Sequence, residues 1–316
     1  MKNPVSKPSG SAPVLSAVFV TFEGRLPFVE RLMKSLCPYP SQFLEIIAVD
    51  NKSCPNVSEW LKTNFPCVTT FRNRENIGTA KAYNIGIDLS KGRYIMLIND
   101  DCCLEEKAAH RAVHFLETHP EFVGIGFSLL DLDGMRRPMK LHLYPFLPSS
   151  LDRPHRITFV GTNNLLCRRE AFQTVGLFDE NYFFFNEDLD WSWRARKIGL
   201  KFYYDPQFRI RHLYRLFSEK PPFNLEKYLT KIVADLYFYR KNTPVLFDFV
   251  KAFYKVSLRH NLKRMRKIGL YPQLKVLLGV ERPEVLSNIY DVQKTLMNGS
   301  ITDLLSLLEN TDLCSC

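Results

Sequence analysis

From Val14 to about Phe202, short apolar runs alternate with longer amphipathic segments. The continuous apolar runs predict β-strands, at 14–21, 44–49, 68–72, 93–98, 123–130 and 158–168. The segments with helical spacing predict helices, at 26–36, 57–64, 78–89, 105–119, 169–175 and 183–199. Runs this apolar are typical of parallel strands that helices cover on both faces. The pattern therefore predicts an α/β fold with a doubly wound sheet, whose ligands bind beyond the carboxyl ends of the strands.

Three other parts of the chain do not follow this alternation of strands and helices: residues 1–13, residues 136–157 and the chain from Pro221 onward. Residues 1–13 lack the apolar core of a secretion signal and predict a short disordered leader. Residues 136–157 are basic and Pro-rich and predict a flexible loop or lid. From the boundary at Pro221-Pro222 onward the pattern is almost wholly helical, and residues 281–316 predict two further helices. No stretch reaches the roughly 18 to 20 apolar residues that span a bilayer.

The net charge of +10 is concentrated in one part of the chain. Between Arg240 and Lys275 there are ten Lys or Arg residues and one acid, so the remainder is close to neutral. This distribution argues against a protein that binds nucleic acid over its whole surface. Within this window, basic residues recur every four positions and predict a basic amphipathic helix at 245–268. Three interpretations stay open for that helix: contact with an anionic membrane, a solvated face packed on the core, or a grip on a phosphorylated or acidic acceptor.

The eight cysteines are scattered and form no C-x-x-C pair with a downstream Cys or His. A structural zinc site therefore has no support in the sequence. Free thiols are typical of a reducing compartment, which predicts a cytoplasmic protein.

Polar residues follow the second and third predicted strands. Asp50-Asn51-Lys52-Ser53 suits either contact with a ribose or base edge, or a turn that caps a helix. The segment from Arg72 to Gly78 opens a helix with small residues, an arrangement that attracts a diphosphate. It lacks the glycine patterns of Rossmann dehydrogenases and P-loop kinases, so those two classes lose their main support.

Two acidic clusters carry the candidate chemistry. Asn99-Asp100-Asp101 ends the fourth predicted strand and suits Mg²⁺ or Mn²⁺, the alternative being an exposed turn. Glu187-Asp188-x-Asp190 follows an aromatic run and suits a general base, because partial desolvation by the aromatic residues raises the pKa of a carboxyl group. The alternative is that these acids cap the start of a helix. His212 follows in a basic and apolar stretch, where it suits either a structural or a ligating role.

Taken in order, these segments resemble family 2 of the inverting glycosyltransferases, whose core is the GT-A (nucleotide-diphospho-sugar transferase) fold. The segments that carry the resemblance span about residues 15–215: Val18–Thr21, Val49–Ser53, Asn76-x-Gly78, Asn99–Asp101, Gly161–Asn164 with Phe172, Gly176–Glu180 and Glu187–Gly199. The resemblance implies the GT-A fold with a mainly parallel central sheet, and the helical pattern beyond Pro221 adds a helical C-terminal extension. It also implies a catalytic domain at 14–220, with a nucleotide-binding half at about 14–101 and an acceptor half at about 102–220. The remainder, 221–316, becomes a basic helical region for membrane or acceptor docking.

The resemblance further assigns roles to single residues. Asp188 matches the catalytic base. Asp101 matches the metal ligand, and in rhamnosyl- and galactofuranosyltransferase-like members a His at the place of His212 completes the metal site. The residues implied at the nucleotide are Thr21, Phe22, Asp50, Asn76, Gly78, Asn84, Asn99 and Asp100, with Asn99 departing from the commoner Asp-first form. The residues implied at the acceptor are Asn163, Asn164, Glu187 and Trp191, of which Trp191 suits packing as well as an acceptor shelf.

The function implied is transfer of a sugar, with inversion and with a divalent Mg²⁺ or Mn²⁺, to a hydroxyl of a glycan or lipid-linked glycan in cell-surface polysaccharide synthesis. UDP- and dTDP-sugars are the expected donors, rhamnose and galactofuranose foremost, and the inner face of the cell membrane is the expected peripheral location. A sugar-1-phosphate nucleotidyltransferase is a rival, but Thr21-Phe-Glu-Gly-Arg25 is a poor match to its Gly-rich loop. A catalytically inactive glycan-binding scaffold is a second rival, against which the presence of Asp101, Asp188 and His212 argues.

Overall fold

A computed structural model of the chain describes residues 12–136, 139, 141, 143, 150–213, 225–250 and 289–297. Most of the predicted leader, ten of the 22 residues of the predicted lid at 136–157, and the predicted basic helix beyond 250 lie outside these ranges. So do the two helices predicted at 281–316, except for the part at 289–297.

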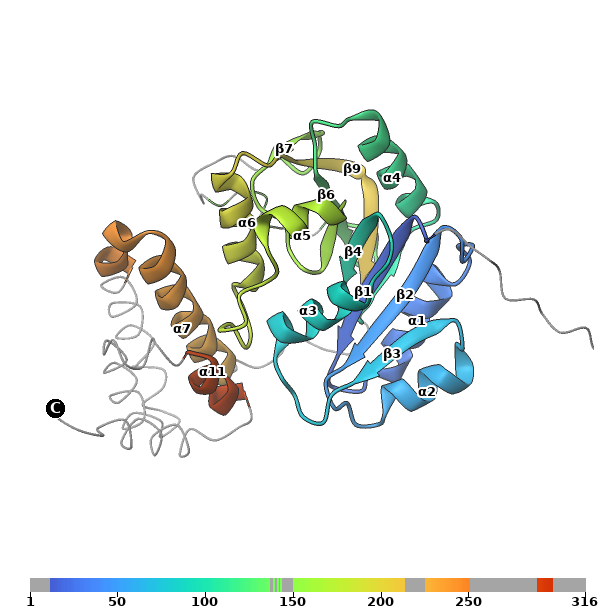
Figure 1. Cartoon of the computed structure of the whole chain (residues 1–316), viewed down its shortest axis with the longest axis horizontal. Coiled ribbons are helices and arrows are strands. Elements are labelled where there is room, and N and C mark those ends of the chain that lie inside the picture. Colours follow the sequence, from blue (N-terminus) through green and yellow to red (C-terminus); the bar gives the residue numbers. More distant parts are fainter. Residues whose placement is uncertain are drawn as a thin grey trace, which may run out of the picture. The chain divides into compact units, whose positions relative to one another are not determined.

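The first half of the sheet is formed by parallel strands, as the apolar runs predict (Figure 1). Its order is β3-β2-β1-β4, with Val18 opposite Ile47 on one side and Leu97 on the other. Because the strands are parallel, the loops after β1, β2 and β4 leave the sheet at the same edge. The elements of this half are β1 (Leu15–Thr21), α1 (Leu26–Leu36), β2 (Leu44–Asp50), α2 (Val57–Asn64), β3 (Val68–Arg72), α3 (Thr79–Leu89) and β4 (Tyr94–Ile98).

The second half of the sheet is mixed. It continues in the order β4-β8-β6-β9-β5, with β7 paired to β9, and β8 runs antiparallel to both of its neighbours. Its elements are β5 (Cys102–Leu104), α4 (Ala108–Thr118), β6 (Gly124–Leu130), β7 (His155–Ile157), β8 (Asn164–Arg168), α5 (Arg169–Val175), α6 (Glu187–Lys197) and β9 (Phe202–His212). The prediction of an α/β fold around a mainly parallel central sheet is confirmed.

Three strands escaped the sequence pattern, and two elements start four or more residues later than predicted. The strands β5 and β7 have three residues each, and β9 interleaves its apolar residues with charged ones and contains Pro206. The strand predicted at 158–168 is regular only from Asn164. The helix predicted at 183–199 begins at Glu187, because Phe185 and Asn186 have positive φ angles, which an α-helix does not accommodate.

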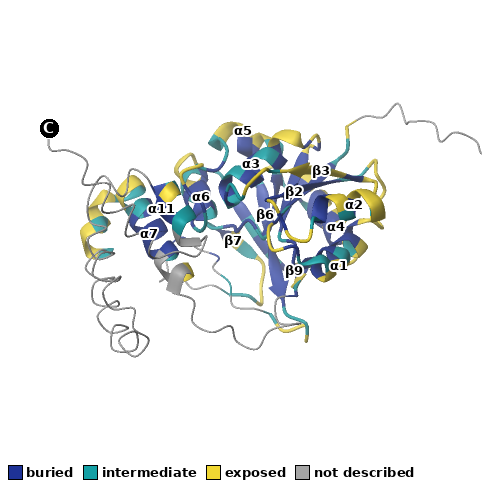
Figure 2. Ribbon diagram, turned by 90° about the horizontal axis from the view of Figure 1, so that it is seen from below, coloured by how far each residue is buried: buried dark blue, intermediate teal, exposed yellow. Residues whose placement is uncertain are grey.

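The core lies on both faces of the sheet (Figure 2). On one face, residues such as Ala17 and Phe19 of β1 join one apolar cluster with buried residues of α1, α2 and α4. On the other face α3 approaches closely at Gly86, where an added Cβ would lie 2.2 Å from Cγ1 of Val18 and 3.3 Å from Cγ2 of Val49. Helices on both faces leave the strand ends as the place where polar side chains gather.

The chain divides into two compact units. The first holds the whole sheet with most of its helices. The second joins Ile77–Lys81 and Phe178–Arg194 to the chain from 218 onward. Its described C-terminal elements are α7 (Leu225–Asn242), a helical segment at 244–250, and α11 (Ile289–Met297), which packs against α7. Among the described residues, none of the helices combines the length and the apolar character that crossing a membrane requires.

Candidate functional site

Two buried carboxylates stand side by side where β4 ends. The side chains of Asp100 and Asp101 are 6% and 5% exposed. Arg25, in the loop between β1 and α1, contacts both: its Nη2 lies 2.9 Å from Oδ1 of Asp100, and its Nη1 lies 3.3 Å from Oδ2 of Asp101. The Thr21 hydroxyl donates to the other oxygen of Asp100 at 2.9 Å. Thr21 at the end of β1 and Arg25 in the loop after it thus hold this carboxylate pair.

The pair remains electrostatically unbalanced. Burial, and to a smaller degree the charge of Asp101, raises the pKa of Asp100 to about 6, although Arg25 acts in the opposite direction. Two adjacent carboxylates with one guanidinium keep an excess of negative charge. Such a place favours an additional cation.

His212, the last residue of β9, lies at the same place. The antiparallel pairing of β5 with β9 sets His212 opposite Cys102, and the Leu213 amide donates to the Asp101 carbonyl at 2.7 Å. As a result, Nε2 of His212 lies 3.6 Å from Oδ1 of Asp101.

Within the described part of the chain, Asp101, Cys102 and His212 form a group whose potential ligand atoms all lie within 4.8 Å of one another. Burial raises the pKa of the Cys102 thiol well above its usual value, so this sulfur is a poor ligand. A carboxylate and an imidazole remain. A site of that composition fits Mn²⁺ or Mg²⁺, which commonly take one or two protein ligands and complete their shell with phosphate oxygens.

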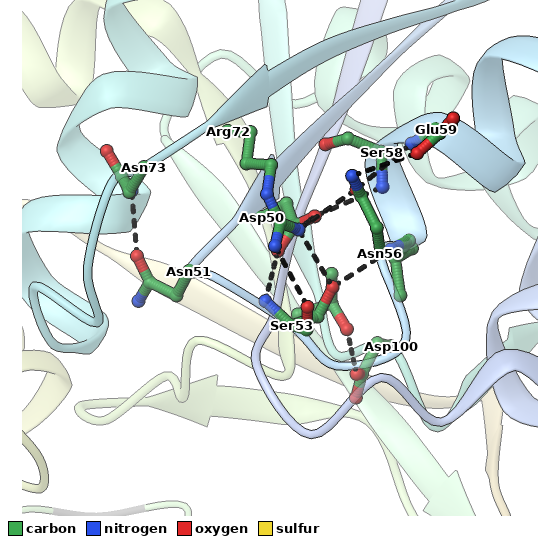
Figure 3. A network of polar contacts seen from close by, with 11 residues as sticks. Asp50, Asn51, Ser53, Asn56, Ser58, Glu59, Arg72, Asn73 and Asp100 are labelled. Atoms are coloured by element: carbon green, nitrogen blue, oxygen red, sulfur yellow. Dashed lines mark hydrogen bonds and ion pairs between the residues drawn. The ribbon is translucent and has the colours of Figure 1, made fainter.

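Asp50 is wholly buried and its carboxylate is engaged in local hydrogen bonds (Figure 3). It accepts from the backbone amides of Ser53 at 2.6 Å and Ser58 at 3.1 Å, and it pairs with Arg72. These are the bonds of a turn that leads into α2, one of the two roles that the sequence left open. The nucleotide contact of Asp50 stays a prediction.

Other predicted residues of the first unit have structural partners. Asn99 accepts from the hydroxyl of Tyr83 in α3 at 3.2 Å. Asn84, the next residue of α3, is buried. Asn164 donates to the Phe127 carbonyl at 2.9 Å and accepts from the Gly161 amide at 3.0 Å. These two bonds brace the turn that enters β8.

The more accessible predicted residues of this unit differ in exposure. Phe22 is exposed, whereas Asn76 and Asn163 are intermediate. Their side chains are therefore accessible enough for the ligand contacts that the resemblance implies, and these contacts stay predictions.

The predicted base lies in the second unit. Asp188 is half-buried in the first turn of α6, and its Oδ1 accepts from the Leu189 amide at 2.7 Å. Glu187 beside it is buried. Asp190 is wholly buried and pairs with Arg194 at 2.8 Å, so it serves the structure of this unit.

Trp191 and Gly78 also belong to this unit. Trp191 is wholly buried and packs on Phe178, which supports the packing role that the sequence left open for it. Gly78 has a φ of +80°, and a Cβ there would lie 2.5 Å from the Phe183 carbonyl oxygen. Only glycine fits at this position without displacing the backbone.

Arg25 is the residue of this site that sequence reasoning missed. Nothing in the pattern of the loop after β1 singles out an arginine. Its place within four residues of a strand end, at the edge where the acidic triplet was predicted, is the signal that could have found it.

A profile described as Glycosyl transferase family 2 matches residues 16–176, about half of the chain. The chain belongs to glycosyl transferase family 2. This finding confirms the predicted family and the prediction of a glycosyltransferase enzyme.

Curated relatives match at modest identity. An uncharacterized glycosyltransferase of Haemophilus influenzae is 31% identical over 33% of this chain and 35% of its own length, so the chain spans about a third of that relative. An N-acetylglucosaminyl-diphospho-decaprenol L-rhamnosyltransferase of Mycobacterium tuberculosis is 25% identical over 63% of this chain and 76% of its own.

Two solved structures share the fold. GalNAc-T7 with UDP, GalNAc and Mn²⁺ superposes with a TM-score of 0.53 at 19% identity, over 72% of this chain and 50% of that one. Residues 1–349 of S. aureus TarS superpose with a TM-score of 0.53 at 12% identity, over 95% of this chain and 91% of that one. These likenesses confirm the predicted GT-A fold class.

Proposed function

We propose that the protein transfers a sugar from a UDP- or dTDP-sugar, with inversion and with a divalent cation, to a hydroxyl of a glycan or lipid-linked glycan. The observation that carries the proposal is the meeting of Asp101 and His212 at the carboxyl edge of the sheet, in a chain of family 2. A carboxylate and an imidazole at that edge are poised to hold a metal beside the diphosphate of a donor.

On this proposal, Asp101 and His212 hold the cation, and Asp100, which accepts from Thr21, lies beside Asp101 in the sequence. The bound cation supplies electrostatic stabilisation to the departing diphosphate. Arg25 adds a positive charge at the same place, fixed before the reaction begins, where negative charge develops on the leaving group. Gly78, Asn84, Asn99 and Phe22 are assigned to the nucleotide by the resemblance.

Asp188 is the proposed general base. It takes the proton from the acceptor hydroxyl, whose oxygen then attacks the anomeric carbon from the face opposite the leaving group. One displacement of this kind inverts the anomeric configuration, and no covalent enzyme intermediate forms. Its half-buried position at a helix start keeps part of the residue accessible to solvent.

Rhamnose is the donor sugar that we place first, with galactofuranose next. The support is the rhamnosyltransferase among the curated relatives, which shares a quarter of its aligned residues with this chain. A lipid-linked acceptor is supported by the name of the same relative, which includes diphospho-decaprenol. Exposed apolar side chains on the helical segment at 244–250 give further support: Val245, Leu246 and Phe249 are 92%, 46% and 71% exposed. This apolar surface follows the basic residue Arg240 near the end of α7, a combination that favours peripheral contact with an anionic membrane.

A thermal-shift screen of UDP- and dTDP-sugars with Mn²⁺ tests the donor assignment. A ligand that binds only the folded chain raises its melting temperature, and the raised value should depend on the metal. The donors that shift the protein are then tested for transfer onto glycan and lipid-linked acceptors. If no UDP- or dTDP-sugar shifts the protein, the donor assignment fails.

A further inference from the structure

The four residues before α6, Phe183–Asn186, form a turn that is unfavourable by itself. Phe185 and Asn186 have φ angles of 67° and 68°, in the left-handed region that residues other than glycine rarely adopt. Two such residues in succession persist only where surrounding contacts hold them. Glu187 and Asp188 follow at once as the first turn of α6. The direction of the Asp188 side chain therefore depends on what holds this turn.

One side chain of the C-terminal helix α11 holds it. Gln293 is wholly buried, and its Oε1 accepts from the amides of Phe183 at 2.8 Å and Phe184 at 3.4 Å. Its Nε2 donates to the carbonyls of Phe184 at 2.7 Å and Thr230 of α7 at 3.1 Å. A single amide thus satisfies three backbone groups of the turn and ties them to two helices.

The helix α7 holds the other end of the turn. Nδ2 of Asn186 donates to Oδ1 of Asp235 at 2.8 Å, and both residues are buried. Asp235 also pairs with Lys231 one turn earlier in α7. The residue immediately before α6 is therefore anchored to a charged group on a regular helix.

The same turn meets the segment around Gly78, which the resemblance assigns to the donor. The Thr79 amide donates to the Phe183 carbonyl at 2.7 Å, beside the close approach at Gly78. Tyr290 of α11 donates to the Ile77 carbonyl at 3.2 Å, and Nζ of Lys81 lies 3.7 Å from the centre of its ring. One residue pair of α11, Tyr290 and Gln293, thus contacts both segments.

We propose that Gln293 and Asp235 are positioning residues for transfer, and that α7 and α11 hold the segment that carries the proposed base instead of serving only as a docking appendage. Gln293 sets the turn that aims the Asp188 carboxyl, and Asp235 fixes Asn186 at its end. The inference rests on the proposed base role of Asp188. The inference goes beyond that base role, because it assigns a positioning role in catalysis to a region outside residues 16–176, the stretch that matches the family.

The test uses the full chain with Gln293→Ala, Gln293→Glu and Asp235→Ala. Asp291→Asn is the control, because Asp291 is exposed on the same helix. The measurements are kcat and donor KM for transfer, Mn²⁺ affinity by calorimetry, melting temperature, and hydrogen–deuterium exchange of the peptide that contains 183–190. Mn²⁺ affinity reports on Asp101 and His212 and shows whether the first unit stays intact.

Gln293→Ala should lower kcat by about 10- to 100-fold, the size expected for a misplaced catalytic group, with Mn²⁺ affinity unchanged. It should also speed exchange at the amides of Phe183 and Phe184, which lose their acceptor. Gln293→Glu keeps that acceptor but loses the two donated bonds, so its kcat should lie between wild type and Gln293→Ala. Asp235→Ala should lower kcat in the same way, and Asp291→Asn should match wild type.

Wild-type kcat in Gln293→Ala would overturn the inference while leaving the proposed function intact. Unchanged exchange at 183–190 would overturn it as well. If Gln293→Ala does not fold, Asp235→Ala and Gln293→Glu decide, and a wild-type kcat in both rejects the positioning role. If the wild-type chain binds a donor but transfers no sugar, this result rejects the proposed function and also this inference, which rests on it.

Discussion

Nε2 of His212 lies 3.6 Å from Oδ1 of Asp101, although His212 ends β9 and Asp101 follows β4, more than 100 residues earlier in the sequence. The contact exists because β5 and β9 pair in antiparallel register, with Cys102 opposite His212. A cation bound here would be shared between two parts of the chain that only the completed sheet brings together.

His212→Ala and Asp101→Asn should each weaken Mn²⁺ binding by about 10- to 100-fold or more, because each removes one of the two suitable ligands. Calorimetric titration of the purified chain measures the affinity. Cys102→Ser is the matched control, since a buried neutral thiol contributes little to the site. Equal Mn²⁺ affinity in all four proteins would contradict the proposed metal site.

Arg25→Ala should lower the free energy of unfolding by about 2 kcal/mol in buffer with chelator, because Asp100 and Asp101 lose a charged hydrogen-bond donor. Added Mn²⁺ should recover part of the loss, since a bound cation replaces the missing positive charge. Urea denaturation with and without Mn²⁺ measures both effects. Lys34→Ala, which removes only an exposed pair with Glu30, should change stability little.

Asp188→Asn should reduce kcat by about 100-fold or more, the contribution typical of a general base, while donor affinity stays the same. Steady-state kinetics together with a donor-binding titration separate these two quantities. Asp190→Asn provides a contrast on the same helix turn. It should destabilise the fold, because Asp190 is buried and bonded to Arg194 and Asn242. Full turnover in Asp188→Asn would reject the base role.

Asp50→Ala should cost about 3 kcal/mol of unfolding free energy, because it leaves two buried amides without their acceptor and removes the charge that pairs with Arg72. Chemical denaturation measures the loss. Glu117→Gln breaks an exposed pair with Arg93 and should cost under about 1 kcal/mol. A loss in Asp50→Ala no larger than that of the control would show that the carboxylate is not needed for the turn.

Stability below about pH 4 should depend on Asp179. Burial acts to raise its pKa, but hydrogen bonds from Lys241 and the Asn181 amide outweigh burial and lower it. A lowered pKa in the folded chain means that the unfolded chain binds the proton more readily. The contribution is therefore complete above the unfolded pKa of about 3.9 and is lost as pH falls through the folded value. Denaturation curves at several pH values should show a shallower acid loss in Asp179→Asn than in wild type.

Much of the fold was readable from the sequence, because burial imposes a local pattern. The parallel strands β1 to β4 are continuous apolar runs, and their helices show the spacing of one buried face, so their bounds were predicted within a residue or two. The acidic triplet was recognisable for the same reason, since it interrupts an apolar run where a strand must end. The resemblance to family 2, now confirmed, rested on these local signals in their order.

Tertiary structure alone decided the rest. The strand β9 mixes charged residues with apolar ones, and its identity depends on pairing with β6, β7 and β5, which lie far from it in the sequence. Arg25 is ordinary in its own loop and becomes part of the site only because parallel strands bring β1 and β4 to one edge. Gln293 is an unremarkable helix residue until two left-handed residues in another segment require an amide to hold them. Local sequence determines which elements form, but non-local pairing determines which side chains meet.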